Sequence, residues 1–175
     1  LHLALGVTEA IDTPYPESPW VVLKFGGRSV STAPNWAVIA QLLRDRLAEG
    51  VQPVVCHSAL VGVSNALIDL LEPAVAGQDT DDKLAKIKLQ HETLATELGV
   101  DPRSLDEHFT NVEQLIAGVK LVGEVSPRVH ARVLAIGELA ATRIGAAYLT
   151  SLGLAVTWFD ARELLESTTI RDQTE

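Results

Sequence analysis

The chain has few residues that could cross-link it or give it a positive surface. Its 175 residues include one cysteine and no methionine, and 14 Lys and Arg stand against 23 Asp and Glu, for a net charge of −9. The single cysteine, Cys56, cannot form an internal disulfide, so we expect a reducing, cytoplasmic setting. The acidic balance argues against nucleic acid or an anionic membrane surface as a partner, because both attract basic residues.

Targeting signals and metal motifs are also lacking. Residues 1–7 have no basic segment ahead of a long apolar core, so no signal peptide is expected, and the apolar stretches look too short and interrupted to cross a bilayer. The sequence predicts no metal site built from protein ligands, because no metal-ligand spacing links its histidines, which are His2, His57, His91, His108 and His130. Cys56 and His57 are adjacent on a predicted strand and should point to opposite faces, which argues against a nucleophilic pair.

Apolar residues are abundant and predict one domain with a sizeable core. They make up 47% of the chain, and 175 residues suit a single domain or one lobe of a larger one. Residues 1–19 contain three prolines and read as an irregular leader. The core is expected over residues 20–175, although the polar tail from Ser167 has no finished element, as if the chain stopped partway through an architecture.

Hydrophobic periodicity predicts an α/β order. Short valine-rich runs predict strands at Trp20–Phe25 and Gln52–His57, buried on both faces, and a third strand at Leu154–Phe159. Helical spacing predicts the remaining elements, namely a helix capped by Ser31 or Thr32 and stopped by Gly50, further helices over 62–76, 84–98 and 104–119, and a segment from Ser126 to Leu152 that breaks at Gly137. This order predicts parallel strands joined by right-handed crossovers.

Lys24 stands at the end of the first predicted strand, directly before Gly26 and Gly27. Ligands of open parallel sheets bind beyond the carboxyl ends of the strands, where glycines let backbone N–H groups approach a phosphate. A lysine ammonium there would contact the same anion. Because the lysine precedes the glycines, the order is neither the dinucleotide-binding motif nor the P-loop. A tight turn with a surface lysine explains the pattern equally well.

The second predicted strand also ends in small residues, in the segment from Ser58 to Asn65. Its hydroxyls and backbone N–H groups could hold a carboxylate or a phosphate, and parallel topology places this loop at the same edge as the first. Capping of the next helix by Ser58 or Ser64 is the simpler alternative for this segment alone.

Glu138 follows Gly137 inside an apolar segment. A buried glutamate needs a partner, and the ammonium group of a substrate is one candidate. Glu138 could instead lie in the first turn of a helix that starts after Gly137, where its charge would favour the helix dipole. It could also form an intrahelical pair with Arg143.

Taken in order, the segments 22–30, 57–67, 135–143 and 159–162 resemble aspartate kinase of the amino acid kinase family. The resemblance implies a three-layer αβα sandwich with a mainly parallel sheet, of which this chain would form an incomplete N-terminal, substrate-binding lobe. It also implies phosphorylation of the side-chain carboxylate of L-aspartate by MgATP, which gives 4-phospho-L-aspartate at the entry to lysine, threonine and methionine synthesis. Without the nucleotide-binding half, the isolated chain should be a poor catalyst.

The resemblance also assigns roles and partners. The catalytic group would be Lys24, phosphate contacts would come from Lys24, Gly26, Gly27 and Ser29, and aspartate would be held by Ser58, Ala59, Ser64 and Glu138. ATP would carry Mg²⁺ through its phosphates, with no protein ligand to the metal. A homo-oligomer and a fusion to another pathway enzyme are further expectations.

Three departures from the family pattern leave alternatives open, of which the missing nucleotide-binding half is the most important. Arg28 stands where the family usually has threonine after the glycines, and Ala140 and Ala141 replace a serine that commonly follows the Gly-Glu pair. The chain could therefore belong to another amino acid kinase with a different substrate, or to a noncatalytic ligand-binding or oligomerisation module of the same fold.

Overall fold

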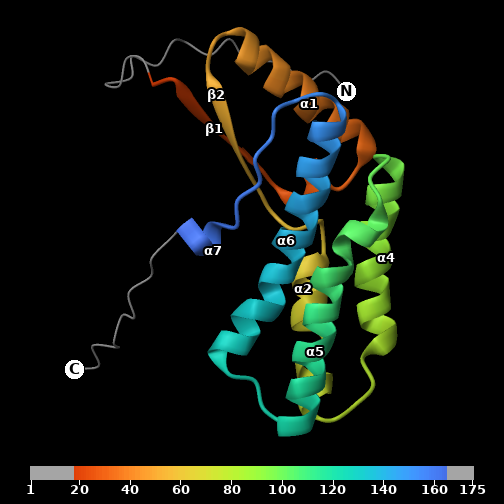
Figure 1. Ribbon diagram of the computed structural model, residues 1–175. Coiled ribbons are helices and arrows are strands. Elements are labelled where there is room, and N and C mark those ends of the chain that lie inside the picture. The colour runs from red at the N-terminus through yellow and green to blue at the C-terminus, as the bar shows by residue number, and fades with distance from the viewer. Residues whose placement is uncertain (1–17, 165–175) are drawn as a thin grey trace, which may run out of the picture.

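The computed structural model describes residues 18–164 (Figure 1). Most of the predicted leader, and the polar tail from Ser167, lie outside the described residues. The described elements are β1 (Trp20–Phe25), a 3-10 turn η1 (Gly27–Val30), α1 (Ala33–Ala48), β2 (Gln52–His57), α2 (Val63–Ile68), α3 (Leu71–Val75), α4 (Asp81–Glu97), a second 3-10 turn η2 (Pro102–Leu105), α5 (Asp106–Val122), α6 (Pro127–Ser151) and α7 (Ala161–Leu164).

Strands β1 and β2 form a parallel pair in which Trp20 lies opposite Gln52 and Phe25 opposite His57. Both strands have the predicted bounds, but burial alternates along each of them. One face packs against the core, whereas Val22 is 67% exposed on the other. The predicted burial on both faces is therefore wrong for the described residues, because their helices cover only one face of the sheet.

Helix α1 connects the two strands and begins as predicted. The side chain of Thr32 accepts a hydrogen bond from the Asn35 N–H and caps the helix, with Pro34 in its first turn. Trp36 is 1% exposed, and its indole N–H donates to the Val30 carbonyl at 2.9 Å. An added Cβ at Gly145 of α6 would overlap the Trp36 ring, so a glycine is required where α6 crosses α1.

Helices α4, α5 and α6 run side by side below the strand pair, with α2 and α3 packed against them (Figure 1). His91 of α4 is 0% exposed in this bundle, and its Nδ1 lies 2.8 Å from the Ile87 carbonyl oxygen. The edge of its ring faces Phe109 of α5, with ring centroids 5.5 Å apart. A potentially charged ring thus lies inside an apolar helix interface.

Helix α6 runs unbroken from Pro127 to Ser151, so the predicted break at Gly137 is wrong. An added Cβ at Gly137 would lie 2.9 Å from the Ala59 Cβ and 2.9 Å from Val63 Cγ1. The glycine therefore permits close packing of a continuous helix rather than ending it.

The predicted helix over residues 62–76 is instead two short helices, α2 and α3, which meet near Leu70. Pro73 accounts for the interruption, because a proline ring inside a continuous helix clashes with the carbonyl four residues earlier and donates no hydrogen bond. Here Pro73 lies in the first turn of α3, where the missing N–H has no helical partner to lose.

The segment Leu154–Phe159 forms no strand, contrary to the prediction. A strand is defined by its ladder to a neighbour, and within residues 18–164 the sheet contains only β1 and β2. The segment instead runs from the end of α6 back past the strands to α7 (Figure 1).

By length and composition alone α6 could span a membrane, contrary to the expectation that the apolar stretches are too short and interrupted. In the structure its buried face contacts α2, α4 and α5. A core helix of a folded domain meets the same criterion, and α6 occupies that position here.

His91 makes the stability of the bundle depend on pH. Burial lowers the pKa of its imidazole below the ordinary value of about 6.5. As pH falls below that value the unfolded chain binds a proton that the folded chain does not, so stability decreases by up to about 1.4 kcal/mol per pH unit. We expect His91→Phe to flatten the fall in urea midpoint between pH 6.5 and 5.

The matched control for this measurement is His130→Gln, because His130 is exposed on α6. It should leave the pH slope unchanged. A His91→Phe variant with the same slope as the wild-type chain would show that other groups cause the acid sensitivity.

Candidate functional site

The loops that follow β1 and β2 contact each other at the carboxyl edge of the sheet. The Ser58 N–H donates to the Phe25 carbonyl at 3.1 Å, and the Val61 N–H donates to the Ser31 hydroxyl at 2.8 Å. The same hydroxyl donates to the Gly27 carbonyl at 2.6 Å. Parallel topology predicts this meeting of the two loops, and these hydrogen bonds fix it.

Gly26 and Gly27 serve different purposes in the first loop. A Cβ on Gly27 would lie 2.8 Å from the Ala59 carbonyl oxygen, whereas a Cβ on Gly26 would meet nothing within 4 Å. Gly27 is therefore a packing glycine, and open space lies beside Gly26.

Two backbone donors follow Gly26 directly in the chain. Among the described residues, the N–H groups of Gly27 and Arg28 have no hydrogen-bond partner. The Ser29 N–H donates to the Gly26 carbonyl at 2.9 Å and is used by the turn, while its side chain is exposed. Consecutive free amides of this kind suit a phosphate oxygen.

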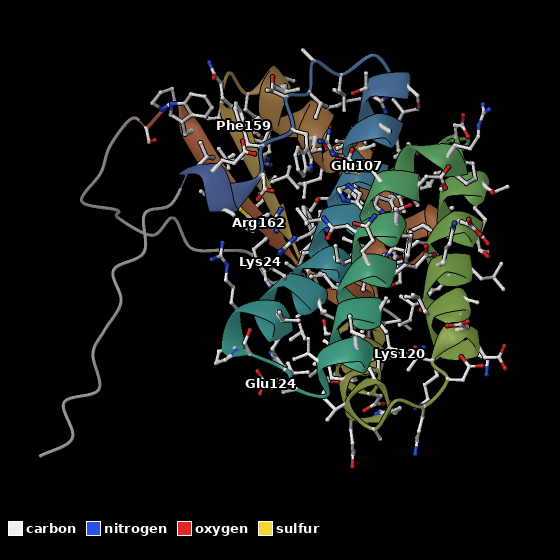
Figure 2. All side chains as sticks on the ribbon, turned by 60° about the horizontal axis from the view of Figure 1, so that its bottom comes forward. Lys24, Glu107, Lys120, Glu124, Phe159 and Arg162 are labelled. Atoms are coloured by element: carbon white, nitrogen blue, oxygen red, sulfur yellow. The ribbon has the colours of Figure 1, made fainter. Side chains whose placement is uncertain are left out.

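Lys24 is exposed on the open face of the sheet, where it lies opposite Cys56 in the strand register (Figure 2). It forms no ion pair with any residue in 18–164. Its ammonium group is therefore uncompensated by the described protein and points away from the core side of β1. An anion beyond the strand end would neutralise it.

The second loop contains Ser58 and Ala59, and Ser64 lies in the first turn of α2. Ala59 is 3% exposed and is wedged between Gly27 and Gly137, so only its backbone is placed to meet a ligand. Ser58 and Ser64 are half-buried. Neither caps α2, because Gly62 in the left-handed conformation occupies the N-cap without any side-chain hydrogen bond. The capping alternative for these serines is wrong.

Glu138 lies next to the contact between α6 and the second loop. It is half-buried and stands in the middle of α6, more than two turns from Pro127, so its predicted place in a first helical turn is also wrong. Arg143 stacks on the Trp158 ring at 3.6 Å and forms no ion pair with Glu138. Within the described chain Glu138 therefore has no cationic partner.

His57 ends β2 and faces the core side. Burial lowers the pKa of its imidazole, while a contact of its Nδ1 with the Ser58 carbonyl acts in the opposite direction. Its ring lies edge-on against Trp36, with centroids 5.4 Å apart. Cys56 is exposed on the opposite face, as the alternation of strand side chains predicts.

Trp158 makes contacts that the sequence does not predict. Its indole N–H donates to the Thr142 hydroxyl at 3.0 Å, and that hydroxyl donates to the Glu138 carbonyl at 2.8 Å. Trp158 therefore ties the segment after α6 to the helical turn that carries Glu138. No local sequence pattern predicts a contact between residues this far apart in the chain.

The parallel strand pair, the helices on one face and the paired loops at the strand ends define an incomplete αβα fold of the amino acid kinase type. The sequence model of the Amino acid kinase family matches residues 19–174. The chain belongs to this family.

Within the family the chain is similar to aspartokinases. It is 36% identical over 147 residues to aspartokinase 3, chloroplastic, of Arabidopsis thaliana, which covers 82% of this chain and 26% of that protein. It is 32% identical over 161 residues to aspartokinase 1, chloroplastic, of the same plant, covering 90% of this chain and 28% of that one.

Solved structures of E. coli aspartokinase III have the same fold. The complex with aspartate and ADP superposes with a TM-score of 0.68 at 25% identity, over 81% of this chain and 31% of the enzyme. The complex with lysine and aspartate gives a TM-score of 0.70 at 26% identity, over 83% and 32%. The chain thus spans about a quarter to a third of the length of these relatives.

The two glycines give a matched test of the loop geometry. We expect Gly27→Ala to lower stability by about 1–3 kcal/mol, because its Cβ would press on the Ala59 carbonyl. Gly26 has φ −80, which alanine accepts, so Gly26→Ala should change the urea midpoint little. Equal effects of the two substitutions on the unfolding free energy would contradict this assignment.

Proposed function

We propose that this chain is the acceptor-binding part of an aspartate kinase, which transfers the γ-phosphoryl group of ATP to the side-chain carboxylate of L-aspartate. One observation carries the proposal. Gly27, Ala59 and Gly137 are in contact, so the segments that carry Lys24, Ser58 and Glu138 are held together at the carboxyl edge of the sheet. The similarity to aspartokinases supports the choice of substrate.

The acceptor needs little activation in this reaction. A free aspartate side chain has a pKa near 3.9, so at neutral pH it is already a carboxylate and no general base has to remove a proton. One carboxylate oxygen bonds to the γ-phosphorus while the bond to the bridging oxygen of ADP breaks. The task left to the protein is to align the two groups and to offset their negative charges.

The residues at the strand ends suit that task. The Lys24 ammonium would neutralise charge on the transferring phosphoryl group, and the free N–H groups of Gly27 and Arg28 would hold one of its oxygens. The space beside Gly26 leaves room for the phosphate. Mg²⁺, held through the phosphates of ATP, supplies further charge neutralisation when bound.

Residues of the second loop, α2 and α6 would bind the acceptor, L-aspartate. The hydroxyls of Ser58 and Ser64 would donate to the aspartate carboxylates, and Glu138 would accept the α-ammonium group. Because Glu138 has no cationic partner within residues 18–164, a substrate ammonium would satisfy a half-buried charge that the described protein leaves unpaired.

A fused second enzyme is a further proposal. A bifunctional aspartokinase/homoserine dehydrogenase of Arabidopsis thaliana is 27% identical to this chain over 154 residues and is covered over 17% of its length. Sequencing of the reading frame beyond Glu175 decides it.

Lys24 is tested in the full-length protein. We expect Lys24→Ala to lower kcat by about 10²–10³-fold, the loss typical of one preorganised group that stabilises transition-state charge, with a smaller change in KM for aspartate. Phosphorylated product is measured with radiolabelled ATP. Lys86→Ala, on the exposed face of α4, is the control and should leave kcat intact. Unchanged turnover in Lys24→Ala would remove Lys24 from the mechanism.

Glu138 is tested by its effect on the acceptor. Glu138→Gln removes the charge but keeps the size, so KM for L-aspartate should rise roughly tenfold or more, the effect of losing a charge-assisted hydrogen bond. Glu113→Gln, on the exposed surface of α5, is the control. The assignment fails if KM is unchanged, and the choice of substrate fails if L-glutamate is phosphorylated as well as L-aspartate.

A further inference from the structure

A polar pocket lies between α5, α6 and the segment that leads into α7. Its volume is about 290 Å³, close to the lower end of the range for small-molecule sites. We call it the α5–α6 pocket and define it by His108 and Asn111 of α5, Arg132 and Arg143 of α6, and Trp158 of the following segment. Glu107 and Arg162, on two of its walls, are labelled in Figure 2.

This pocket is distinct from the proposed aspartate kinase site at the carboxyl edge of the sheet, which we call the rim and define by Lys24, Ser58 and Glu138. Lys24, Ser58 and Glu138 are not among the residues that line it. Arg132 and Arg143 lie eleven positions apart on α6, which corresponds to three helical turns and places them on the same face. Gly137, by contrast, faces Ala59 and Val63.

Arg143 is held in a fixed orientation on the pocket wall. Its guanidinium carbon lies 3.6 Å from the centroid of the Trp158 ring, and the indole N–H is anchored to Thr142 at 3.0 Å. Stacking uses the flat face of a guanidinium and leaves its N–H groups directed outward in the plane. Arg143 therefore presents preorganised donors, and it forms no ion pair within the described chain.

The third arginine of the pocket, Arg162, is already paired with Asp160. Arg162 donates from Nε to both oxygens of Asp160, at 2.9 and 3.1 Å, and its backbone N–H donates to the same carboxylate at 2.9 Å. This pairing lowers the pKa of the Asp160 carboxyl, which is 9% exposed. Asp160 is thus committed to Arg162 and is not the partner of Arg143.

The charge of the lining selects the ligand. Three guanidinium groups, of Arg132, Arg143 and Arg162, are balanced by three carboxylates, of Glu107, Asp160 and Glu163. A single carboxylate adds less negative charge to this balanced lining than a group with two negative charges, and it matches the fork of one stacked arginine that forms no ion pair within the described chain. Carboxylate is therefore favoured over phosphate.

We propose that the α5–α6 pocket binds the carboxylate group of a small organic acid, with Arg143 as the bidentate donor and Arg132 and Asn111 as additional donors. The site is independent of the proposed kinase activity, since it shares no residue with the rim. Its occupation adds a negative charge beside His108.

His108 provides the readout. Burial lowers the pKa of its imidazole, and the positive charges of Arg143 and Arg162 lower it further, while Glu107 and Asp160 act in the opposite direction. A carboxylate bound to Arg143 offsets that positive charge and favours the protonated ring. Binding therefore raises the pKa of His108.

The test is an NMR titration of the His108 ring in the 175-residue chain. Sodium acetate is the probe, and sodium chloride keeps the ionic strength constant. We expect a saturable shift of the His108 signals and an upward shift of its pKa. Arg143→Gln should weaken acetate binding roughly tenfold or more, because a charge-assisted hydrogen-bonding pair is lost.

Two further variants separate binding from folding. Arg143→Lys keeps the charge but loses the planar fork, so it should also bind acetate less tightly than the wild-type chain. Arg128→Gln, on the exposed first turn of the same helix, should bind acetate like the wild-type chain. Dispersed amide signals in each variant verify that it is folded.

Three results would overturn the proposal. One is a shift of His108 that rises linearly with acetate and does not saturate. Another is equal binding by the wild-type chain and Arg143→Gln. The third is saturable binding of inorganic phosphate without saturable binding of acetate, which would reassign the pocket to phosphate.

Discussion

The architecture depends on a close three-way packing contact that only small residues permit. Ala59 lies between Gly27 of the first loop and Gly137 of α6, and a Cβ on either glycine would come within 3 Å of an Ala59 atom. This contact joins the end of β1, the end of β2 and the middle of the longest helix. Every proposed role at the rim follows from it, because Lys24, Ser58 and Glu138 lie close in sequence to the three contact points.

The rim differs from the α5–α6 pocket in how its charges are paired. Lys24 and Glu138 have no ionic partners within residues 18–164, whereas the pocket balances its arginines against an equal number of carboxylates. Unpaired charges of opposite sign suit a substrate that brings both an ammonium and anionic groups. In the pocket, the stacked Arg143 forms no ion pair within the described residues and suits one carboxylate group. The same helix, α6, contributes to both sites from different faces.

Local sequence patterns correctly predicted the secondary-structure elements that short-range interactions determine. The apolar runs at Trp20–Phe25 and Gln52–His57 gave strands with the correct bounds, and Thr32 caps α1 as expected. Pro73 is also a local signal for the interruption between α2 and α3, although the apolar spacing over residues 62–76 alone predicts one helix.

Predictions were wrong where the local structure depends on tertiary contacts. Gly137 looks like a helix break in isolation, and only its contact with Ala59 explains why a continuous helix has a glycine there. Leu154–Phe159 has the composition of a strand but no partner strand among the described residues. The turn that contains Lys24, Gly26 and Gly27 could be located from its motif. The stacking of Arg143 on Trp158 could not, because it depends on the path of the chain after α6, which no local sequence pattern predicts.

A crystal structure of the full-length protein with L-aspartate and a non-hydrolysable ATP analogue tests the central claim most directly. The account predicts aspartate between Ser58 and Glu138, with its side-chain carboxylate facing the γ-phosphate and that phosphate held by Lys24 and the N–H groups of Gly27 and Arg28. Aspartate bound away from the Gly27–Ala59–Gly137 contact, or phosphates more distant from Lys24 than a hydrogen bond or ion pair allows, would contradict it.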